Sequence, residues 1–369
     1  MDVTKFLKLH LVSVKSNYET LTGVFGPKVV SDTMHSEELI RMFNNENPYP
    51  PSPKVLQAVK KCLPSVNRYP DPTYYYLTEK ISEYTGLKPE NIIVGNGSLN
   101  LIQLIYSVFV DSDDEVILPI PSFEQFEYLL SLVGGKPVYI PLQKPNFILE
   151  PEKVADSVSP RTKLIILINP HNPVGNYTSK ETIRRILEED AIVLVDEAYY
   201  EYCKKTVAPW VQNYENLIVL RTLSKAFGLA GLRVGYALAN PELIKQLHKP
   251  ELFFPINTLS LQAAIAALED TEYAEETVSK TVEERERLTE ELSKIDGLKP
   301  YPSETNFILV EITKENLNAG TVFTKLLENK IFIKNCTDQK GLGEKFFRVS
   351  VSSPESNRLF IETLKTIME

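Results

Sequence analysis

One lysine of the chain stands in a segment whose residue types suit amine chemistry, Thr222-Leu223-Ser224-Lys225-Ala226-Phe227-Gly228, with Arg233 following. A desolvated lysine has a lowered pKa, and its neutral amine can then form a Schiff base with an aldehyde. Thr222 and Ser224 add hydroxyls and Arg233 adds a guanidinium fork, which are donors that suit a phosphate dianion. A surface loop would explain any short fragment of this string, but it is a poor explanation of the whole segment.

Two more polar groups follow apolar runs in the chain. Asp196 ends the run Ala191-Ile192-Val193-Leu194-Val195, and an ionised aspartate there can face a pyridinium N–H while Tyr199 hydrogen-bonds a ring hydroxyl. We interpret Glu197, between them, as a solvated neighbour. Asn172 lies in the turn Asn169-Pro170-His171-Asn172-Pro173, whose prolines would aim its amide. A strand-ending helix cap and an ordinary turn remain the alternatives for these two positions.

Three weaker signals lie elsewhere in the chain. Gly95-Asn96-Gly97-Ser98 joins a predicted strand to a predicted helix, where backbone amides can bind phosphate, although a plain loop would look the same. Tyr69, in Asn67-Arg68-Tyr69-Pro70, is explained as well by burial or by an interface. Arg348 stands in the apolar run Phe346-Phe347-Arg348-Val349, so it needs either an internal ion pair or an anionic substrate as its partner.

The elements that would position these residues are short apolar runs without polar alternation. The predicted strands cover residues 92–94, 116–118, 138–140, 164–168, 191–195 and 217–220, with helical patterns between several of them. Such strands are buried on both faces, which predicts an α/β fold with a mostly parallel, helix-covered sheet. The polar residues follow the strand ends, where ligands bind in open α/β sheets.

The chain changes character near residue 256. A charged helical pattern over 271–295 is followed by strand-like pieces at 307–310 and 346–351 and by a helix that begins at Ser353-Pro354. A capping box over 178–181 predicts that Thr178 caps the helix that follows. We expect an N-terminal arm (1–44) associated with the smaller domain, a large domain (45–255) and a small α+β domain (256–369).

The composition is that of an ordinary globular protein. The 369 residues are 43% hydrophobic and 24% charged, and the net charge of -9 argues against a nucleic-acid-binding protein. No apolar stretch approaches the roughly 18 residues of a membrane helix, and the N-terminus lacks the apolar core of a secretory signal. Three scattered cysteines and four scattered histidines favour a reduced, cytoplasmic protein with no disulfide and no metal site.

Together these residues resemble the class I and II aminotransferases of fold type I, and among them most nearly the histidinol-phosphate aminotransferases. The resemblance runs from about residue 44 to the C-terminus. It rests on Asn45-Glu46-Asn47-Pro48, Asn67-Arg68-Tyr69-Pro70-Asp71, Gly95-Asn96-Gly97-Ser98, Asp196-Glu197-Ala198-Tyr199, Arg221 through Arg233, and Ser303-Glu304-Thr305-Asn306-Phe307. It implies pyridoxal 5'-phosphate (PLP) as the cofactor.

The resemblance also implies a role for each matching residue. The catalytic residues would be Lys225, which carries the cofactor and moves a proton, Asp196 at the pyridine nitrogen and Tyr199 at the ring oxygen. The other cofactor-binding residues would be Gly97, Ser98, Leu99, Phe123, Asn172, Thr222, Ser224, Arg233 and Tyr69. The substrate-binding residues would be Asn47, Arg348 and Lys334. Because Tyr69 would come from a second subunit, a homodimer is implied.

Some positions depart from the family pattern. Leu99-Asn100 replaces a common Asp-Glu, His171 precedes Asn172, and no Pro-Tyr element is evident before Asn45. Lys334 stands where the family has a second arginine for the substrate phosphate, and a lysine offers charge without a bidentate fork. These departures concern the substrate and leave the cofactor assignment intact.

The function that the resemblance implies is amino transfer between histidinol phosphate and 2-oxoglutarate, in histidine biosynthesis. The same motifs would serve an aromatic or other amino-acid aminotransferase, or a threonine-phosphate decarboxylase. Outside this class, a non-catalytic nucleotide-binding α/β protein is the alternative, but the chain has no Gly-x-Gly-x-x-Gly or Walker sequence to support it.

Overall fold

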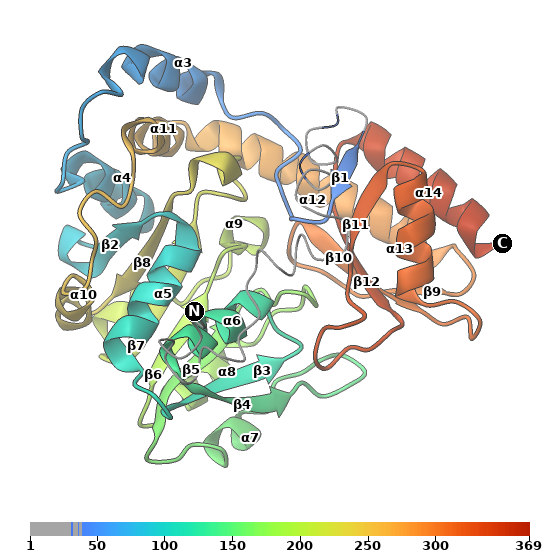
Figure 1. The fold of residues 1–369 in the computed structure, drawn as a ribbon, viewed down its shortest axis with the longest axis horizontal. Coiled ribbons are helices and arrows are strands. Elements are labelled where there is room, and N and C mark those ends of the chain that lie inside the picture. The colour runs from blue at the N-terminus through green and yellow to red at the C-terminus, as the bar shows by residue number, and fades with distance from the viewer. Residues whose placement is uncertain (1–30, 32–35, 37–38) are drawn as a thin grey trace, which may run out of the picture.

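The computed structural model describes residues 31, 36 and 39–369 and contains two sheets, each with its own helices. Figure 1 shows the two parts side by side, with the long helix α12 (Thr271–Ser293) reaching from one to the other. Near its start α12 packs on α9 (Tyr200–Cys203) of the larger part. Further along it packs on strands β9 (Leu298–Pro300) and β10 (Phe307–Ile312) of the smaller part.

The larger sheet has seven strands in the order β2-β8-β7-β6-β5-β3-β4. Only β8 runs antiparallel to its neighbours, so the sheet is mostly parallel, as predicted. The strands are β2 (Ile92–Gly95), β3 (Glu115–Ile120), β4 (Lys136–Pro141), β5 (Thr162–Ile168), β6 (Ile192–Asp196), β7 (Leu217–Thr222) and β8 (Gly235–Ala239). All six predicted strands are present, whereas β8, a run of mostly small residues, was not predicted.

Helices cover both faces of this sheet, which is why its strands show no polar alternation. One face packs on α5 (Gly97–Phe109), α6 (Glu124–Val133) and α10 (Pro241–Leu247). The other face packs on α4 (Tyr75–Thr85), α7 (Pro151–Ala155), α8 (Lys180–Ile186), α9, α11 (Thr258–Leu268) and the start of α12. Neighbours such as Leu194 and Val195 therefore point to opposite faces, and both are fully buried.

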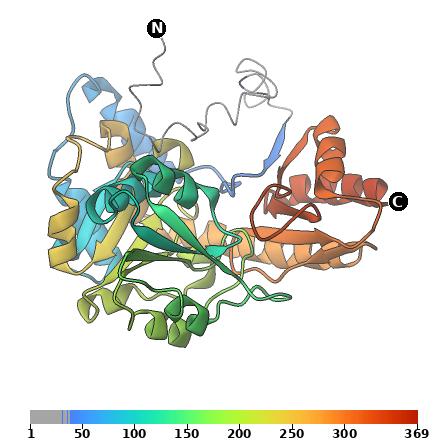
Figure 2. The same cartoon turned by 60° about the horizontal axis from the view of Figure 1, so that its bottom comes forward.

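The smaller sheet has five strands in the order β1-β11-β12-β10-β9, and all pairs but one are antiparallel. The strands are β1 (Ile40–Met42), β9 (Leu298–Pro300), β10 (Phe307–Ile312), β11 (Ile331–Asn335) and β12 (Phe346–Ser350). The second half of α12, α13 (Ala319–Glu328) and α14 (Pro354–Met368) complete its core. Figure 2 shows this α+β part in orange and red, with the blue strand β1 from the N-terminal region beside it.

The remaining elements are short or lie at the edge. Helix α3 (Pro53–Cys62) packs on α11. The short 3-10 helices are η3 (Leu63–Ser65), η4 (Pro89–Asn91), η5 (Ala208–Gln212) and η6 (Ala230–Leu232). No helix within the described residues combines the length and the apolarity that crossing a membrane requires.

The capping residues of α14 and α8 test two of the predicted helix starts. Ser353 caps α14 as predicted, and its side chain accepts a hydrogen bond from the Ser356 amide. The Thr178 cap is wrong, because Ser179 caps α8 and accepts from the Thr182 amide at 3.1 Å. Helix α12 ends at Ser293, close to the predicted end of the charged pattern at residue 295.

The predicted division into three segments stays a prediction. Most of the arm (1–44) lies outside the described residues, although β1 within it pairs with β11. Helix α11 lies just beyond the predicted boundary after residue 255 and packs on α3 and α4 of the larger part.

Candidate active site

The candidate residues gather where parallel strands end. Asp196 is the last residue of β6, Asn172 follows β5, and Lys225 follows β7. Since neighbouring parallel strands carry their carboxyl ends to one edge of the sheet, residues far apart in sequence meet there. Residues 43–45 and Arg348 of β12 reach the same place from the smaller part.

The amine of Lys225 lies in a partly buried position among other cations. Its Nζ donates to the backbone oxygen of Asn44 at 2.7 Å. Burial, reinforced by the charges of Arg348 and Arg233, lowers the pKa of Lys225 to about 8, while Glu46 and Asp196 oppose the shift. The neutral, nucleophilic amine is therefore accessible near neutral pH.

The carboxyl group of Asp196 is almost fully buried. Its Oδ1 accepts from the amide of Ala198 at 3.0 Å. Burial raises the pKa of Asp196 to about 7, Glu197 adds to the shift, and Lys225 works against it. A cationic partner facing this carboxylate would relieve the cost of burying its charge.

Tyr199 and Asn172 form a hydrogen-bonded chain with residues of the smaller part. The Asn172 amide donates to the Tyr199 hydroxyl at 3.4 Å, and Asn45 Nδ2 donates to the same hydroxyl at 2.8 Å. The Tyr199 ring packs edge-on against Phe307. Burial raises the pKa of Tyr199 to about 12, so the hydroxyl keeps its proton and can also act as a donor.

Arg348 is a buried cation with only neutral hydrogen-bond partners among the described residues. Its NH1 donates to Asn172 Oδ1 at 2.5 Å and its NH2 to the Phe43 backbone oxygen at 2.6 Å, while buried Nε has no partner. The guanidinium also lies over the Phe307 ring. No carboxylate within residues 39–369 pairs with it, so the internal ion pair that the sequence allowed is absent there.

Several predicted phosphate ligands surround the first turn of α5. Arg233 donates to Ser224 Oγ at 3.2 Å, and the Ser224 amide donates to Thr222 Oγ1 at 3.1 Å. Gly97 leaves room for this guanidinium, because a Cβ at Gly97 would lie 2.4 Å from Arg233 NH2. Arg233 forms no ion pair among the described residues. The cation therefore stands at the helix start, where the amides of Gly97, Ser98 and Leu99 have no intrahelical acceptor.

Gly235 allows strand β8 to pack closely against the start of α5. Gly235 pairs with Thr222 across the β7–β8 ladder. A Cβ on Gly235 would lie only 2.7 Å from the amide nitrogen of Ser98, so glycine is needed there for α5 to approach the strand ends.

Lys334 lies beside Arg348 but is paired with an acid. The two residues are register partners in β11 and β12, so their side chains share one face of the sheet. Lys334 Nζ lies 3.0 Å from Glu124, the first residue of α6. Phe123, just before it, packs edge-on against Phe126 and lines a groove of about 640 Å³ with Gln339 and Lys340.

Two predicted site residues have other contacts in the structure. The Asn47 amide donates to the Ala226 backbone oxygen at 2.9 Å, so this side chain holds the loop that carries Lys225. Tyr69 is 81% exposed and stacks on Phe254, with ring centroids 4.6 Å apart. The roles predicted for both residues stay predictions.

Sequence reasoning missed the part played by Asn45. Its backbone has φ of 55°, its amide nitrogen donates to Ser350 Oγ, and its oxygen accepts from Asn306. Asn45 thereby joins β12 of the smaller part to Tyr199 of the larger part. Asparagine tolerates positive φ better than most residues, but nothing in the local pattern signals that conformation.

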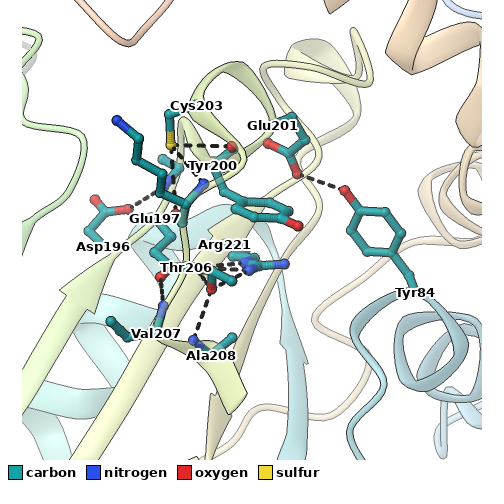
Figure 3. Close-up of polar contacts among 12 residues, drawn as sticks. Tyr84, Asp196, Glu197, Tyr200, Glu201, Cys203, Thr206, Val207, Ala208 and Arg221 are labelled. Atoms are coloured by element: carbon teal, nitrogen blue, oxygen red, sulfur yellow. Dashed lines mark hydrogen bonds and ion pairs between the residues drawn. The ribbon is translucent and has the colours of Figure 1, made fainter. Parts of the chain in front are cut away.

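The interpretation of Glu197 as a solvated neighbour is wrong. Its side chain is only 2% exposed and pairs with Arg221 NH2 at 2.9 Å. Figure 3 shows this pair, together with Tyr200, Thr206 and Val207, beside Asp196. A charged side chain buried directly after a strand end was invisible in the sequence because its partner lies 24 residues away.

The sequence matches the family described as aminotransferase class I and II over residues 37–364. It is 37% identical over 373 aligned residues to the histidinol-phosphate aminotransferase of Methanocaldococcus jannaschii, covering 100% of this chain and 97% of the relative. It is 41% identical to that of Thermoanaerobacter pseudethanolicus, covering 89% and 93%. The structure of the Sinorhizobium meliloti histidinol-phosphate aminotransferase in complex with pyridoxal-5'-phosphate superposes with a TM-score of 0.86 at 26% identity, covering 98% and 97%. The chain belongs to the class I and II aminotransferases, with the fold-type I architecture that its sequence predicted.

Proposed function

We propose that the protein is a PLP-dependent aminotransferase that moves an amino group between histidinol phosphate and 2-oxoglutarate, in histidine biosynthesis. The names of the relatives support this substrate. The single observation that carries the proposal is that Lys225 and the buried Asp196 lie at the ends of neighbouring parallel strands and interact electrostatically, with the Arg233 guanidinium at the start of α5.

The residues around Lys225 fit PLP. Arg233, Ser224, Thr222, Ser98 and the first amides of α5 would hold its phosphate, because they combine a cation, hydroxyls and free N–H donors. Asp196 would face its pyridine nitrogen, Tyr199 and Asn172 its ring oxygen, and Phe123 its ring face. The space beside Gly97 that Arg233 occupies supports this fit.

The chemistry divides between the cofactor and the chain. When bound, PLP supplies an aromatic ring that accepts the electron pair left by the departing α-proton of the amino donor. Lys225 would take that proton and later donate it back, since about half of its amine groups are neutral near pH 8. The Asp196 carboxylate would hold the ring nitrogen by a charged hydrogen bond, and the Tyr199 hydroxyl would orient the ring.

Arg348 would bind the anionic end of both substrates. A buried guanidinium with neutral partners and a free Nε can take a carboxylate or a phosphate oxygen without breaking an ion pair. Lys334, its register partner, would add a second positive charge for a phosphate, and Asn47 would support substrate binding by holding the Lys225 loop.

A homodimer completes the proposed site. Tyr69 would reach the cofactor phosphate of a second copy, which its exposed position allows. We also propose a cytoplasmic location, which is supported by the free state of all three cysteines.

An amino-donor panel tests the function. Histidinol phosphate with 2-oxoglutarate should yield glutamate, and it should do so faster than aromatic amino acids, while phosphothreonine should release no carbon dioxide. Preference for an aromatic donor, or carbon dioxide release, would replace the substrate. Failure of borohydride with PLP to label Lys225 would remove the cofactor assignment as well.

An Arg348→Ala variant tests the dual binding role. We expect kcat/KM to fall by about 100-fold for both partners, because a charged hydrogen bond is worth about 1.5–3 kcal/mol. Loss for only one partner would confine Arg348 to that half-reaction, and normal kinetics for both would refute its role.

A further inference from the structure

The buried Glu197–Arg221 pair lies directly behind the proposed cofactor site. Arg221 Nε and NH2 lie 3.1 and 2.9 Å from Glu197 Oε2, and the two side chains are 3% and 2% exposed. In Figure 3 the Arg221 guanidinium lies beside the Tyr200 ring, and its central carbon is 3.7 Å from the ring centroid. Glu197, Arg221 and Tyr200 take no direct part in the proposed reaction.

Both oxygens of the Glu197 carboxylate accept hydrogen bonds. Besides Arg221, the Thr206 hydroxyl donates to Oε2 at 2.7 Å and the Val207 amide donates to Oε1 at 2.7 Å. The Thr206 oxygen in turn accepts from Arg221 NH2 at 2.8 Å. A buried pair with this many partners is held in one geometry, and removing one member would leave an uncompensated charge.

The pair links the two strands whose ends carry Asp196 and Lys225. Asp196 lies opposite Leu220 in the β6–β7 ladder, and the Glu197 amide donates to the Leu220 oxygen at 2.8 Å. Glu197 and Arg221 come one step further along the same two strands. Their side chains point to the opposite face from Asp196, since successive strand residues alternate.

The pair also determines the charge next to Asp196. The charged groups that act on the Asp196 carboxyl are Glu197 on its own strand and Lys225 from the loop after β7, and the Tyr199 hydroxyl lies near it. Glu197 raises the pKa of Asp196, after the larger effect of burial. Arg221 balances that negative charge, so Asp196 can ionise at neutral pH opposite a protonated ring nitrogen.

We propose that Glu197 and Arg221 are positioning residues for the cofactor site. Their ion pair locks the ends of β6 and β7 together, and it keeps the surroundings of Asp196 neutral enough for that carboxylate to stay ionised. The proposal rests on PLP binding at Asp196 and Lys225, and it concerns neither a new ligand nor direct contact with the substrate.

The charge effect is tested with Glu197→Gln, whose matched control is Glu201→Gln. Both changes remove one acid that interacts with Arg221, but Glu201 is not among the groups that shift Asp196. The measurement is the dissociation constant of PLP for the apoenzyme by equilibrium dialysis, from about pH 5.5 to about pH 8.5. Titrations of PLP itself and of Lys225 are common to all variants, so only differences between variants count.

We expect Glu197→Gln to move the acid midpoint of PLP binding down by about one pH unit, because the Arg221 charge is then unbalanced and favours ionised Asp196. Glu201→Gln should leave the midpoint in place. Equal midpoints for the two variants, whether shifted or not, would overturn the charge effect.

The locking effect is tested with the double variant Glu197→Gln/Arg221→Met, which removes both charges together. Here the midpoint should return to the wild-type value, while PLP affinity at pH 8 should fall by roughly tenfold because the strand ends are no longer joined. Thr206→Val, which removes only the bridging hydroxyl, should weaken PLP binding in the same direction and serves if the double variant does not fold. Affinity within twofold of wild type in the folded variant would overturn the lock. If the wild-type apoenzyme did not bind PLP, the proposed function would fail instead.

Discussion

The amine of Lys225 illustrates how single residues obtain their chemistry from their surroundings. Burial and two arginines lower its pKa to about 8, so the reactive neutral form increases about tenfold per pH unit below that value. We expect the rate of PLP uptake by the apoenzyme to rise with pH and to level off above about pH 8. Stopped-flow absorbance measures this rate, with Lys225→Ala as the control that should show no covalent uptake. A rate independent of pH between 6 and 9 would mean that the amine is not the titrating group.

His171 is a second residue whose charge state is fixed by burial. It is 5% exposed, its Nδ1 has no partner among the described residues, and burial lowers its pKa to about 3. Below about pH 6.5 the unfolded chain binds a proton on His171 that the folded protein does not bind. The free energy of unfolding of the wild type should therefore fall on acidification from pH 6.5 to 5. In His171→Asn this fall should be smaller, by up to about 1.4 kcal/mol per pH unit. Urea unfolding of the wild type and the variant at several pH values checks this, and an equal pH slope for the two would contradict it.

At the scale of elements, the sequence revealed what local pattern determines. The strands β2 to β7 were predicted because uninterrupted apolar runs suffice to define them. Strands β8 and β11 were not predicted, since Gly235–Ala239 and Ile331–Asn335 carry small or polar residues. The residues that chemistry requires at strand ends, such as Asp196 and Lys225, were predicted too. Contacts between distant elements were not predictable, which is why Asn45 and the Glu197–Arg221 pair emerged only from the structure.

The contact between β11 and α6 gives a prediction about the substrate. Lys334 is paired with Glu124 at 3.0 Å. If Lys334 binds the substrate phosphate, as proposed, that phosphate must compete with this carboxylate for the lysine. Glu124→Gln should lower KM for histidinol phosphate by about two- to fivefold, because a partly exposed ion pair is worth about 0.5–1 kcal/mol. The KM for unphosphorylated histidinol should stay unchanged.

The neighbouring pair supplies the control for that experiment. Glu127 pairs with Lys340 in the same contact between α6 and the segment after β11. Glu127→Gln therefore loosens the contact without freeing Lys334. If both variants lowered KM for histidinol phosphate to a similar extent, the cause would be movement of the two parts and not the charge on Lys334.

At the scale of the whole molecule, the surface beside α3 and α4 suggests how the site is completed. Tyr69 is 81% exposed and stacks on Phe254, and Phe253, in contact with the same ring, is 88% exposed, which is unusual for large apolar side chains that lie together. If Tyr69 serves the partner's cofactor, each site of a homodimer combines Lys225 of one copy with Tyr69 of the other.

Mixing two defective variants tests this arrangement. Lys225→Ala and Tyr69→Ala should each be inactive or nearly so as homodimers, yet a hybrid contains one site with both wild-type residues. Random exchange should therefore restore about a quarter of the wild-type activity, because half of the dimers are hybrids with one intact site out of two. After subunit exchange, the activity of the mixture is compared with the summed activities of the two separate variants. Size-exclusion chromatography of tagged copies verifies that hybrids have formed. If verified hybrids gain nothing, Tyr69 does not cross the interface, whereas the Lys225–Asp196 site within one copy would be unaffected.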